Sequence, residues 1–299
     1  MELLVQPDDG AMPLVVAIQK AKVSVDLLIF RFDLPQVEKA LYAAVIRGVV
    51  TRAFIAHRNQ NGGKKLRELE LRLLAGGLTV TRSGEDFVRY HGKMMIIDRR
   101  TLFLLGFNCT QLDIARSRSF GIITRKRKVV QEALKLFDAD CTRQGYVTGS
   151  PDLVISPINA RQRLSAFIRG ARHELLIYDL KVSDPSMLQL LRERVNAGVD
   201  VRVLGSVGKH GAFLKAQKLR GIRLHVRAMV RDGRRAFVGS QSLRKLELDG
   251  RREVGIIVRD LKVVRKLQAA FEADWASISL AGPGATEPST PERAAAVNA

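Results

Sequence analysis

The same three-residue pattern occurs twice in this chain of 299 residues: a histidine, a basic residue two positions later and an aspartate seven positions later. In the order of the chain, the pattern consists of His91, Lys93, Asp98, His225, Arg227 and Asp232. The two copies are 134 residues apart, and the same offset relates Gly121 to Gly255 and Asp140 to Asp274. A register kept over this distance indicates an internal duplication, so the chain is expected to fold as two related halves.

Each copy is expected to form a strand, a tight turn and a second strand. In the first copy, an apolar run at 94–97 ends at Asp98, and another apolar run follows at 102–105. Alternate side chains of a strand share a face, so we expect His91 and Lys93 to point the same way. An imidazole beside an ammonium group suits a phosphate ester, because one group can attack phosphorus or carry a proton while the other neutralises charge on oxygen.

The duplicated pattern resembles the phospholipase D superfamily, whose mark is two copies of His-x-Lys-x4-Asp, each followed by a Gly-Ser-x-Asn-like turn. The resemblance covers about residues 13–278. It implies an α/β fold of two homologous lobes, each a mixed β-sheet flanked by helices, packed about a pseudo-twofold axis around a shared cleft. It also implies phosphodiester chemistry without a metal or other cofactor, in which one histidine attacks phosphorus to form a phosphohistidine and the other protonates the leaving group.

Carried over to this chain, the resemblance makes His91 and His225 the catalytic histidines, with Lys93 and Arg227 as the neighbouring cations. The two histidines need opposite protonation states, so their surroundings should drive their pKa values apart. We expect His91 to be the nucleophile.

The expected nucleophile depends on a carboxylate, Glu253. It stands 28 residues after His225, where family members place a carboxylate that hydrogen-bonds a catalytic histidine; the equivalent first-half position is Ser119. An oriented, neutral imidazole is the better nucleophile. If the pairing crosses the pseudo-twofold axis, Glu253 serves His91. If it stays within its own half, the roles of the two histidines are exchanged, and the sequence leaves both arrangements open.

The chain also departs from the superfamily pattern. Arg227 stands where the second lysine is expected. A guanidinium group keeps its proton and binds phosphate through bidentate hydrogen bonds. The Gly-Ser-x-Asn segment is altered in both copies, and its remaining polar residues, expected to contact substrate, are Asn108, Ser240 and Ser242. A catalytically decayed relative that still binds polyanions is therefore an alternative to an enzyme.

The two aspartates of the pattern are assigned a structural role. Asp98 and Asp232 fall at the turn, at an odd spacing from their histidines, so we expect them to hold backbone rather than to touch substrate. The Asp232-Gly233 pair favours a hairpin turn by itself.

Two loops are further candidates for substrate contact. Strand, helix and strand alternate in each half, which predicts parallel pairing, and ligands tend to bind at the carboxyl ends of such strands. His57 and Arg58 begin the loop after the second strand of the first half, and Lys209 and His210 occupy the equivalent loop of the second half.

The predicted organisation has four parts. Residues 1–145 form the first lobe, 146–157 are a linker rich in turn residues, 158–280 form the second lobe, and 281–299 are a tail expected to be disordered because it is rich in Ala, Pro, Thr and Glu. The internal pseudo-dimer favours a monomer.

The charge points to the class of partner. Lys and Arg total 50 against 30 Asp and Glu, a net charge of +20, which favours a polyanion, either nucleic acid or an anionic membrane surface; a generally basic, solvated surface is the alternative. Two cysteines, Cys109 and Cys141, fit a reducing compartment. We therefore expect a cytoplasmic protein, peripheral at the inner face of the membrane if its substrate is a phospholipid. Phospholipid is the leading substrate by analogy, and a nuclease acting on DNA or RNA is the alternative.

Overall fold

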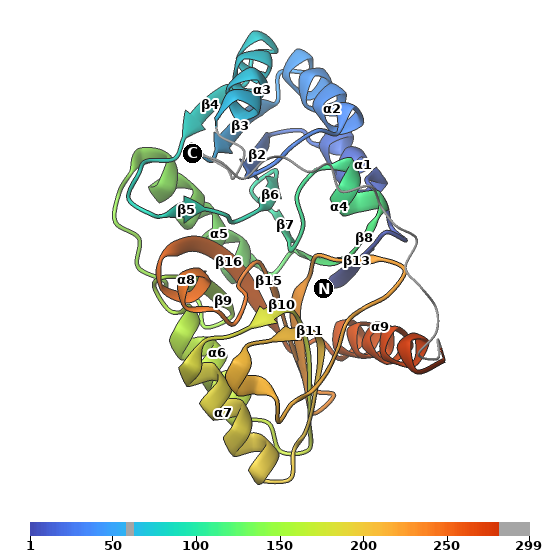
Figure 1. The fold of residues 1–299 in the computed structure, drawn as a ribbon. Helices are drawn as coiled ribbons and strands as arrows, with labels where there is room; N and C mark the ends of the chain where they lie inside the picture. The colour runs from blue at the N-terminus through green and yellow to red at the C-terminus, as the bar shows by residue number, and fades with distance from the viewer. Residues whose placement is uncertain (58–62, 281–299) are drawn as a thin grey trace, which may run out of the picture.

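The structure, a computed structural model, describes residues 1–57 and 63–280. Two β-sheets form two lobes, one above the other in Figure 1. The strands of the first sheet, in spatial order, are β1 (Glu2–Gln6), β8 (Ser117–Thr124), β7 (Thr101–Leu105), β6 (Met94–Ile97), β2 (Ser24–Ile29), β3 (Val50–Ile55) and β4 (Thr79–Arg82), with β13 (Arg223–Leu224) paired to β8. Those of the second are β12 (Lys215–Gln217), β11 (Asp200–Val207), β10 (Glu174–Val182), β14 (Arg227–Arg231), β15 (Arg235–Gly239), β16 (Arg251–Val258) and β5 (Arg89–Tyr90), with β9 (Leu153–Ser156) paired to β16.

Helices cover both sheets, and apolar residues fill the space between them. The helices are α1 (Met12–Lys20), α2 (Pro35–Ile46), α3 (Lys64–Ala75), α4 (Gln111–Ala115), α5 (Arg127–Thr142), α6 (Ala160–Arg169), α7 (Pro185–Asn196), α8 (Lys245–Asp249) and α9 (Leu261–Leu280), with a short 3₁₀ helix, η1 (Lys209–Gly211). Helices α1, α2 and α3 pack on the outer face of the first sheet and α6 and α7 on that of the second. The central core lies between the sheets and includes the buried faces of α5 and α9.

The two halves repeat the same topology. β2 pairs in parallel with β3 across helix α2, and β10 pairs in parallel with β11 across helix α7. In each half, an antiparallel hairpin, β6–β7 or β14–β15, completes the central part of the sheet. Every residue of β2 is buried, as expected for a central strand with both faces covered. The predicted fold class, two lobes with mixed sheets flanked by helices, is confirmed.

The chain crosses between the sheets at each histidine, so one prediction is wrong: His91 and Lys93 do not lie on one strand. β5 pairs with β16 of the second sheet, whereas β6 belongs to the first. Between them, the amides of His91 and Gly92 both donate to the carbonyl oxygen of Arg252, at 2.8 and 3.0 Å. No continuous ladder forms, because the backbone changes partner sheet at this point. The second copy behaves in the same way, since β13 pairs with β8 of the first sheet and β14 lies in the second.

Equivalent ion pairs join the two lobes. Arg118 of β8 donates to both carboxylate oxygens of Asp274 on α9, at 2.9 and 3.0 Å, and the hydroxyl of Tyr178 donates to the same carboxylate at 2.5 Å. At the related positions, Arg252 of β16 lies 3.1 Å from Asp140 of α5. The strands that pair with β13 and β5 at the histidine crossings are thereby fixed to a helix of the opposite lobe.

The segment between the two lobes is not only a linker. The segment 146–157, predicted as a linker, contains β9, which pairs with β16 in the second sheet. None of the helices within residues 1–57 and 63–280 combines the length and apolar character needed to cross a lipid bilayer. The predicted tail, 281–299, lies outside the described residues.

Candidate active site

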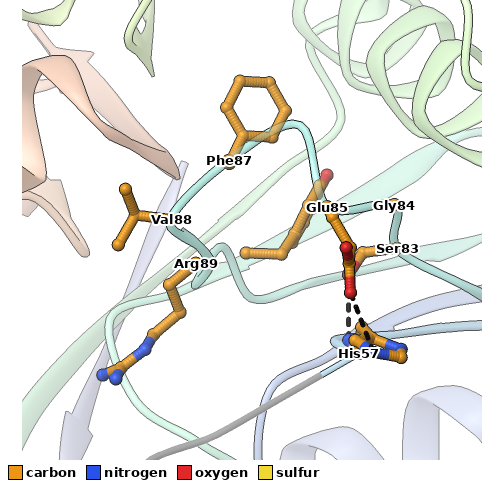
Figure 2. A pocket seen from close by; sticks show the side chains of 8 residues that line it. His57, Ser83, Gly84, Glu85, Phe87, Val88 and Arg89 are labelled. Carbon is orange, nitrogen blue, oxygen red and sulfur yellow. Dashed lines mark hydrogen bonds and ion pairs between the residues drawn. The ribbon is translucent and has the colours of Figure 1, made fainter.

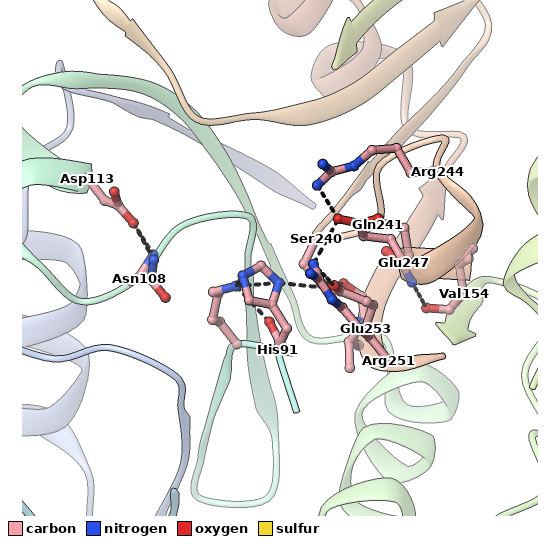
Figure 3. A network of polar contacts seen from close by, with 12 residues as sticks. His91, Asn108, Asp113, Val154, Ser240, Gln241, Arg244, Glu247, Arg251 and Glu253 are labelled. Carbon is pink, nitrogen blue, oxygen red and sulfur yellow. Dashed lines mark hydrogen bonds and ion pairs between the residues drawn. The ribbon is translucent and has the colours of Figure 1, made fainter. Parts of the chain in front are cut away.

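His91 and Glu253 meet across the lobe interface. Nδ1 of His91 lies 2.8 Å from Oε2 of Glu253, which comes from β16 of the second sheet (Figure 3). The ammonium group of Lys93 lies 3.1 Å from each ring nitrogen of His91 and donates to its carbonyl oxygen at 2.6 Å. All three side chains are buried. Of the two arrangements that the sequence left open for Glu253, the structure has the one that crosses the pseudo-twofold axis.

Burial sets the protonation of this group. It lowers the pKa of His91 well below its ordinary value, and the positive charges of Lys93 and Arg227 lower it further. Burial also lowers the pKa of Lys93 to about 7, although Glu253 acts in the opposite direction. The pKa of Glu253 is raised, chiefly by burial, with Lys93 opposing the shift. His91 is therefore held as a neutral imidazole, which is the form that a nucleophile requires.

His225 also faces a carboxylate, one that the sequence analysis missed. Its Nδ1 lies 3.3 Å from Oδ2 of Asp113 on α4, but the alignment is not that of a hydrogen bond. Burial and the charge of Arg227 lower the pKa of His225 well below its ordinary value, although Asp113 acts in the opposite direction. The pKa values of both histidines are lowered, so the prediction that their surroundings drive them apart is wrong. The pKa of Asp113 is itself lowered: burial would raise it, but His225 and hydrogen bonds from Asn108 and Arg223 outweigh that effect. The repeat contained a signal for this residue, because the 134-residue offset relates Asp113 to another acid, Glu247.

The two histidines share one positively charged environment. Lys93 and Arg227 each lower the pKa of both His91 and His225, so both imidazoles lie within electrostatic reach of the same two cations. Arg227 is buried, and its Nε and Nη1 groups have no hydrogen-bond partner among the described residues. Buried donors are normally paired, and a phosphate oxygen would pair these with charge-assisted hydrogen bonds.

The polar residues of the altered turns support the site's carboxylates. Asn108 donates to Oδ2 of Asp113 from its amide side chain at 2.6 Å and from its backbone at 2.9 Å (Figure 3). The hydroxyl of Ser240 bonds to the backbone of Val254, next to Glu253, and opposes the rise in the pKa of that carboxylate. Ser242 donates to the buried carboxylate of Asp179. In this structure, Asn108 and Ser240 therefore position the groups that face the histidines.

Asp98 and Asp232 hold backbone at equivalent places outside this cluster. Oδ1 of Asp98 accepts hydrogen bonds from three successive amides, those of residues 22–24, at 2.7–3.1 Å. The carboxylate of Asp232 accepts from the amides of residues 172–174. Both aspartates adopt left-handed backbone conformations, with φ of 53° and 52°, as the tight turns require.

The loop residues separate into different environments. His57 lines a cavity of about 270 Å³ together with Arg89 and Tyr90, and its Nε2 lies 3.5 Å from Glu85 (Figure 2). Arg58 lies outside the described residues.

The structure does not bring Lys209 or His210 to the histidine cluster. Both side chains are exposed on η1, and within the described part of the chain no hydrogen bond or ion pair joins either one to the cluster. This loop is instead held against α7, because Arg192 donates to the carbonyl oxygen of His210 at 3.3 Å.

A second cavity has a volume of about 230 Å³. It is lined by Arg31 and Lys65, by the acids Asp33 and Asp113, and by apolar residues that include Leu69 and Leu112. Through Asp113 this cavity reaches the carboxylate that faces His225. Its lining offers both cationic and apolar contacts to a substrate.

Sequence comparison identifies a family. A family model described as "Cardiolipin synthase, PLD-like domain" matches residues 14–141 and 164–275, which together are more than half of the chain. A search of curated proteins finds no match.

Several solved structures are similar. Polyphosphate kinase from Porphyromonas gingivalis aligns with a TM-score of 0.77 and 17% identity over 92% of this chain and 47% of its own, so this chain spans about half the length of that kinase. Phosphatidylserine synthase from Haemophilus influenzae Rd KW20 aligns with a TM-score of 0.65 and 12% identity over 93% of this chain and 85% of its own. Nuc, a phospholipase D family member from Salmonella typhimurium, aligns with a TM-score of 0.42 and 24% identity over 48% of this chain and 96% of its own. At these identities, the first two alignments establish a shared fold.

Proposed function

The chain belongs to the phospholipase D superfamily, in the family of cardiolipin synthase PLD-like domains, and from this we propose that it is a phosphodiesterase or phosphatidyltransferase that acts on phospholipids through a phosphohistidine. The observation that carries the proposal is the pairing of His91 with Glu253 at 2.8 Å in a buried cluster that contains Lys93 and Arg227. This arrangement offers an oriented imidazole and two cations to one phosphate group.

In the proposed first step, Nε2 of His91 attacks phosphorus, because Nδ1 faces Glu253 and the contact favours the tautomer with its proton on Nδ1. The new P–N bond forms as the P–O bond to the leaving alcohol breaks. His225 gives its proton to the departing oxygen. The negative charge of the bound phosphodiester, together with Asp113, favours the protonated form of His225 that this step needs.

In the second step, water or an alcohol attacks the phosphohistidine, and neutral His225 takes up the proton of the attacking hydroxyl. The P–N bond breaks and His91 returns to its starting state. Water as acceptor gives hydrolysis, and an alcohol gives phosphatidyl transfer. Lys93 and Arg227 stabilise the charge on the phosphoryl oxygens in both steps.

Exposed apolar side chains beside the cluster support a lipid substrate. Leu112 on α4 is 46% exposed and Leu246 on α8 is 41% exposed. The two leucines are related by the repeat, and each immediately precedes an acid of the site region, Asp113 or Glu247. Val88, 73% exposed, is held next to α8 because its amide donates to the carbonyl oxygen of Gly250. Apolar side chains in this position would insert into a lipid surface while the basic groups face its phosphates.

A nuclease is the second candidate function, favoured by the net charge of +20, since a cationic surface binds a nucleic-acid backbone as well as an anionic membrane. Two assays in EDTA separate the candidates: release of the headgroup from phosphatidylglycerol vesicles and nicking of plasmid DNA. We expect headgroup release, abolished by His91→Ala and by His225→Ala. His173→Ala is the matched control, because His173 is exposed outside the cluster. Nicking without headgroup release would assign the nuclease. Neither activity, with phosphate binding retained, would assign a decayed polyanion-binding relative.

A further inference from the structure

The repeat places one arginine in each half at the start of the histidine crossing, and the two arginines have different partners. Arg223, two residues before His225, forms an ion pair with Asp113 at 2.7 Å. Arg89, two residues before His91, has no carboxylate partner among the described residues. The acid equivalent to Asp113 is Glu247, and Arg251 already pairs with it at 2.8 Å. One side of the pseudo-symmetric site is therefore neutralised and the other keeps a positive charge.

The unneutralised arginine lies close to the expected nucleophile. The ring of Phe30 packs edge-on against His91, with ring centroids 4.5 Å apart. The guanidinium carbon of Arg89 lies 5.8 Å from the Phe30 centroid, and that of Arg31 lies 5.6 Å from it. The imidazole of His91 and the two guanidinium groups therefore contact the same ring.

Other cations strengthen the positive potential around Arg89. Burial lowers the pKa of Arg89, and the charges of Arg251 and Arg31 lower it further, against the opposing effect of Glu253 and Glu247. Mutual repulsion among cations is unfavourable and is relieved when an anion binds near them.

Space for an anion is present beside Arg89. Its side chain lines the cavity of about 270 Å³, on the side away from the contact between His57 and Glu85 (Figure 2). Ser83, Gly84 and Glu85 also line this cavity, and Glu85 faces His57. The cavity is linked to the histidine cluster through Arg89, because Arg89 and His91 both contact the ring of Phe30.

We propose that Arg89 forms a second anion subsite that binds another phosphate of the substrate beside the phosphodiester at His91. The inference rests on the proposed function and narrows its substrate class to molecules with two phosphates a few bonds apart. Such a molecule is either a glycerolipid with two phosphates or a nucleic-acid strand, and the shared chemistry is the paired phosphate.

Binding of small probes tests the subsite without turnover. The probes are glycerol 1-phosphate and glycerol 1,3-bisphosphate for the lipid spacing, and thymidine 5′-phosphate and thymidine 3′,5′-bisphosphate for the nucleic-acid spacing. Calorimetry at constant ionic strength gives the ratio of affinities within each pair. We expect the full-length protein to prefer at least one bisphosphate by about tenfold or more, as one charge-assisted contact would give. A preference for the bisphosphate within the glycerol pair would identify a lipid ligand, and one within the thymidine pair would identify a nucleic-acid ligand.

Three variants assign the preference to Arg89. Arg89→Gln should bring the ratio close to one, whereas Arg89→Lys should keep most of it and so shows that the fold tolerates substitution at this position. Arg265→Gln removes the same charge from an exposed position on α9 and should leave the ratio unchanged. An equal ratio in the wild type and Arg89→Gln overturns the inference.

The inference and the proposed function can fail separately. If Arg89→Gln abolishes the bisphosphate preference but neither vesicles nor plasmid are cleaved, the second subsite stands and the proposed function fails. If vesicles are cleaved but Arg89→Gln leaves the ratio unchanged, the proposed function stands and the second subsite is wrong.

Discussion

Glu253 and His91 belong to opposite lobes, yet Oε2 of the glutamate lies 2.8 Å from Nδ1 of the histidine. The contact is completed only when the two sheets pack together, because β16 carries Glu253 and the crossing after β5 carries His91. The packing of the two lobes therefore also orients the imidazole of His91, the expected nucleophile.

Replacing Glu253 should reduce activity without reducing stability. Glu253→Gln keeps the size of the side chain but removes the charge that orients His91, so we expect kcat to fall by about 10² to 10⁴-fold. The folded-state pKa of Glu253 is raised above 4.5, so its ionised form disfavours folding once the pH rises above that value. At pH 7, the glutamine variant should therefore match or exceed the wild-type melting temperature. The ¹⁵N shift of His91 Nδ1 reports the lost contact independently of turnover, and an unchanged shift with wild-type kcat would contradict the assignment.

Lys93 should impose a limit on activity near neutral pH. Its pKa in the free protein is lowered to about 7, so it loses its charge as the pH rises through that value. Because kcat/KM reports the ionisation of the free enzyme, we expect a falling limb centred near pH 7. Arg stays charged throughout this range, so Lys93→Arg should move the limb upward by about two pH units or more. A limb at the same pH in both proteins would show that another group is responsible.

Asp113 should affect the acid rather than the nucleophile. Asp113 raises the pKa of His225, so Asp113→Asn should lower that pKa and decrease the protonated fraction of His225. We expect kcat to fall by about tenfold to a hundredfold, and the decrease should be largest for substrates with poor leaving groups, which depend most on proton transfer. Asp249→Asn, at an exposed position on α8, is the control. Equal losses with good and poor leaving groups would argue against a role through His225.

The ion pair between Arg118 and Asp274 should stabilise the packing of the lobes. Both side chains are largely buried, so Arg118→Ala and Asp274→Ala should each cost about 3 kcal/mol, because each leaves an unpaired charge behind. The double variant should cost clearly less than the sum of the two. Urea unfolding of the four proteins of this double-mutant cycle measures the coupling, and strictly additive effects would mean that the pair is not an energetic unit.

The repeat made part of the site predictable. Residues at fixed positions in a duplicated unit occupy equivalent positions in its fold. His91 and His225, each with a basic residue two positions later, could therefore be identified from the repeat in the sequence. Asp113 was equally accessible through its relation to Glu247, but its role depends on α4 turning it toward His225. Lys209 and His210 were selected by analogy with the loop after β3, yet η1 packs against α7 and leaves both side chains in solvent.

By itself, the sequence determined the duplication, the alternation of strands and helices and the chemical groups of the site, because these depend on local periodicity and on residue identity. The tertiary structure alone decided that each histidine lies where the chain passes from one sheet to the other, that Glu253 serves the opposite lobe, and that Arg89 and Arg223 differ in charge environment. These are relations between residues far apart in the chain. Such relations arise when two apolar sheet faces are buried against each other, and the local sequence does not encode which polar groups that burial brings together.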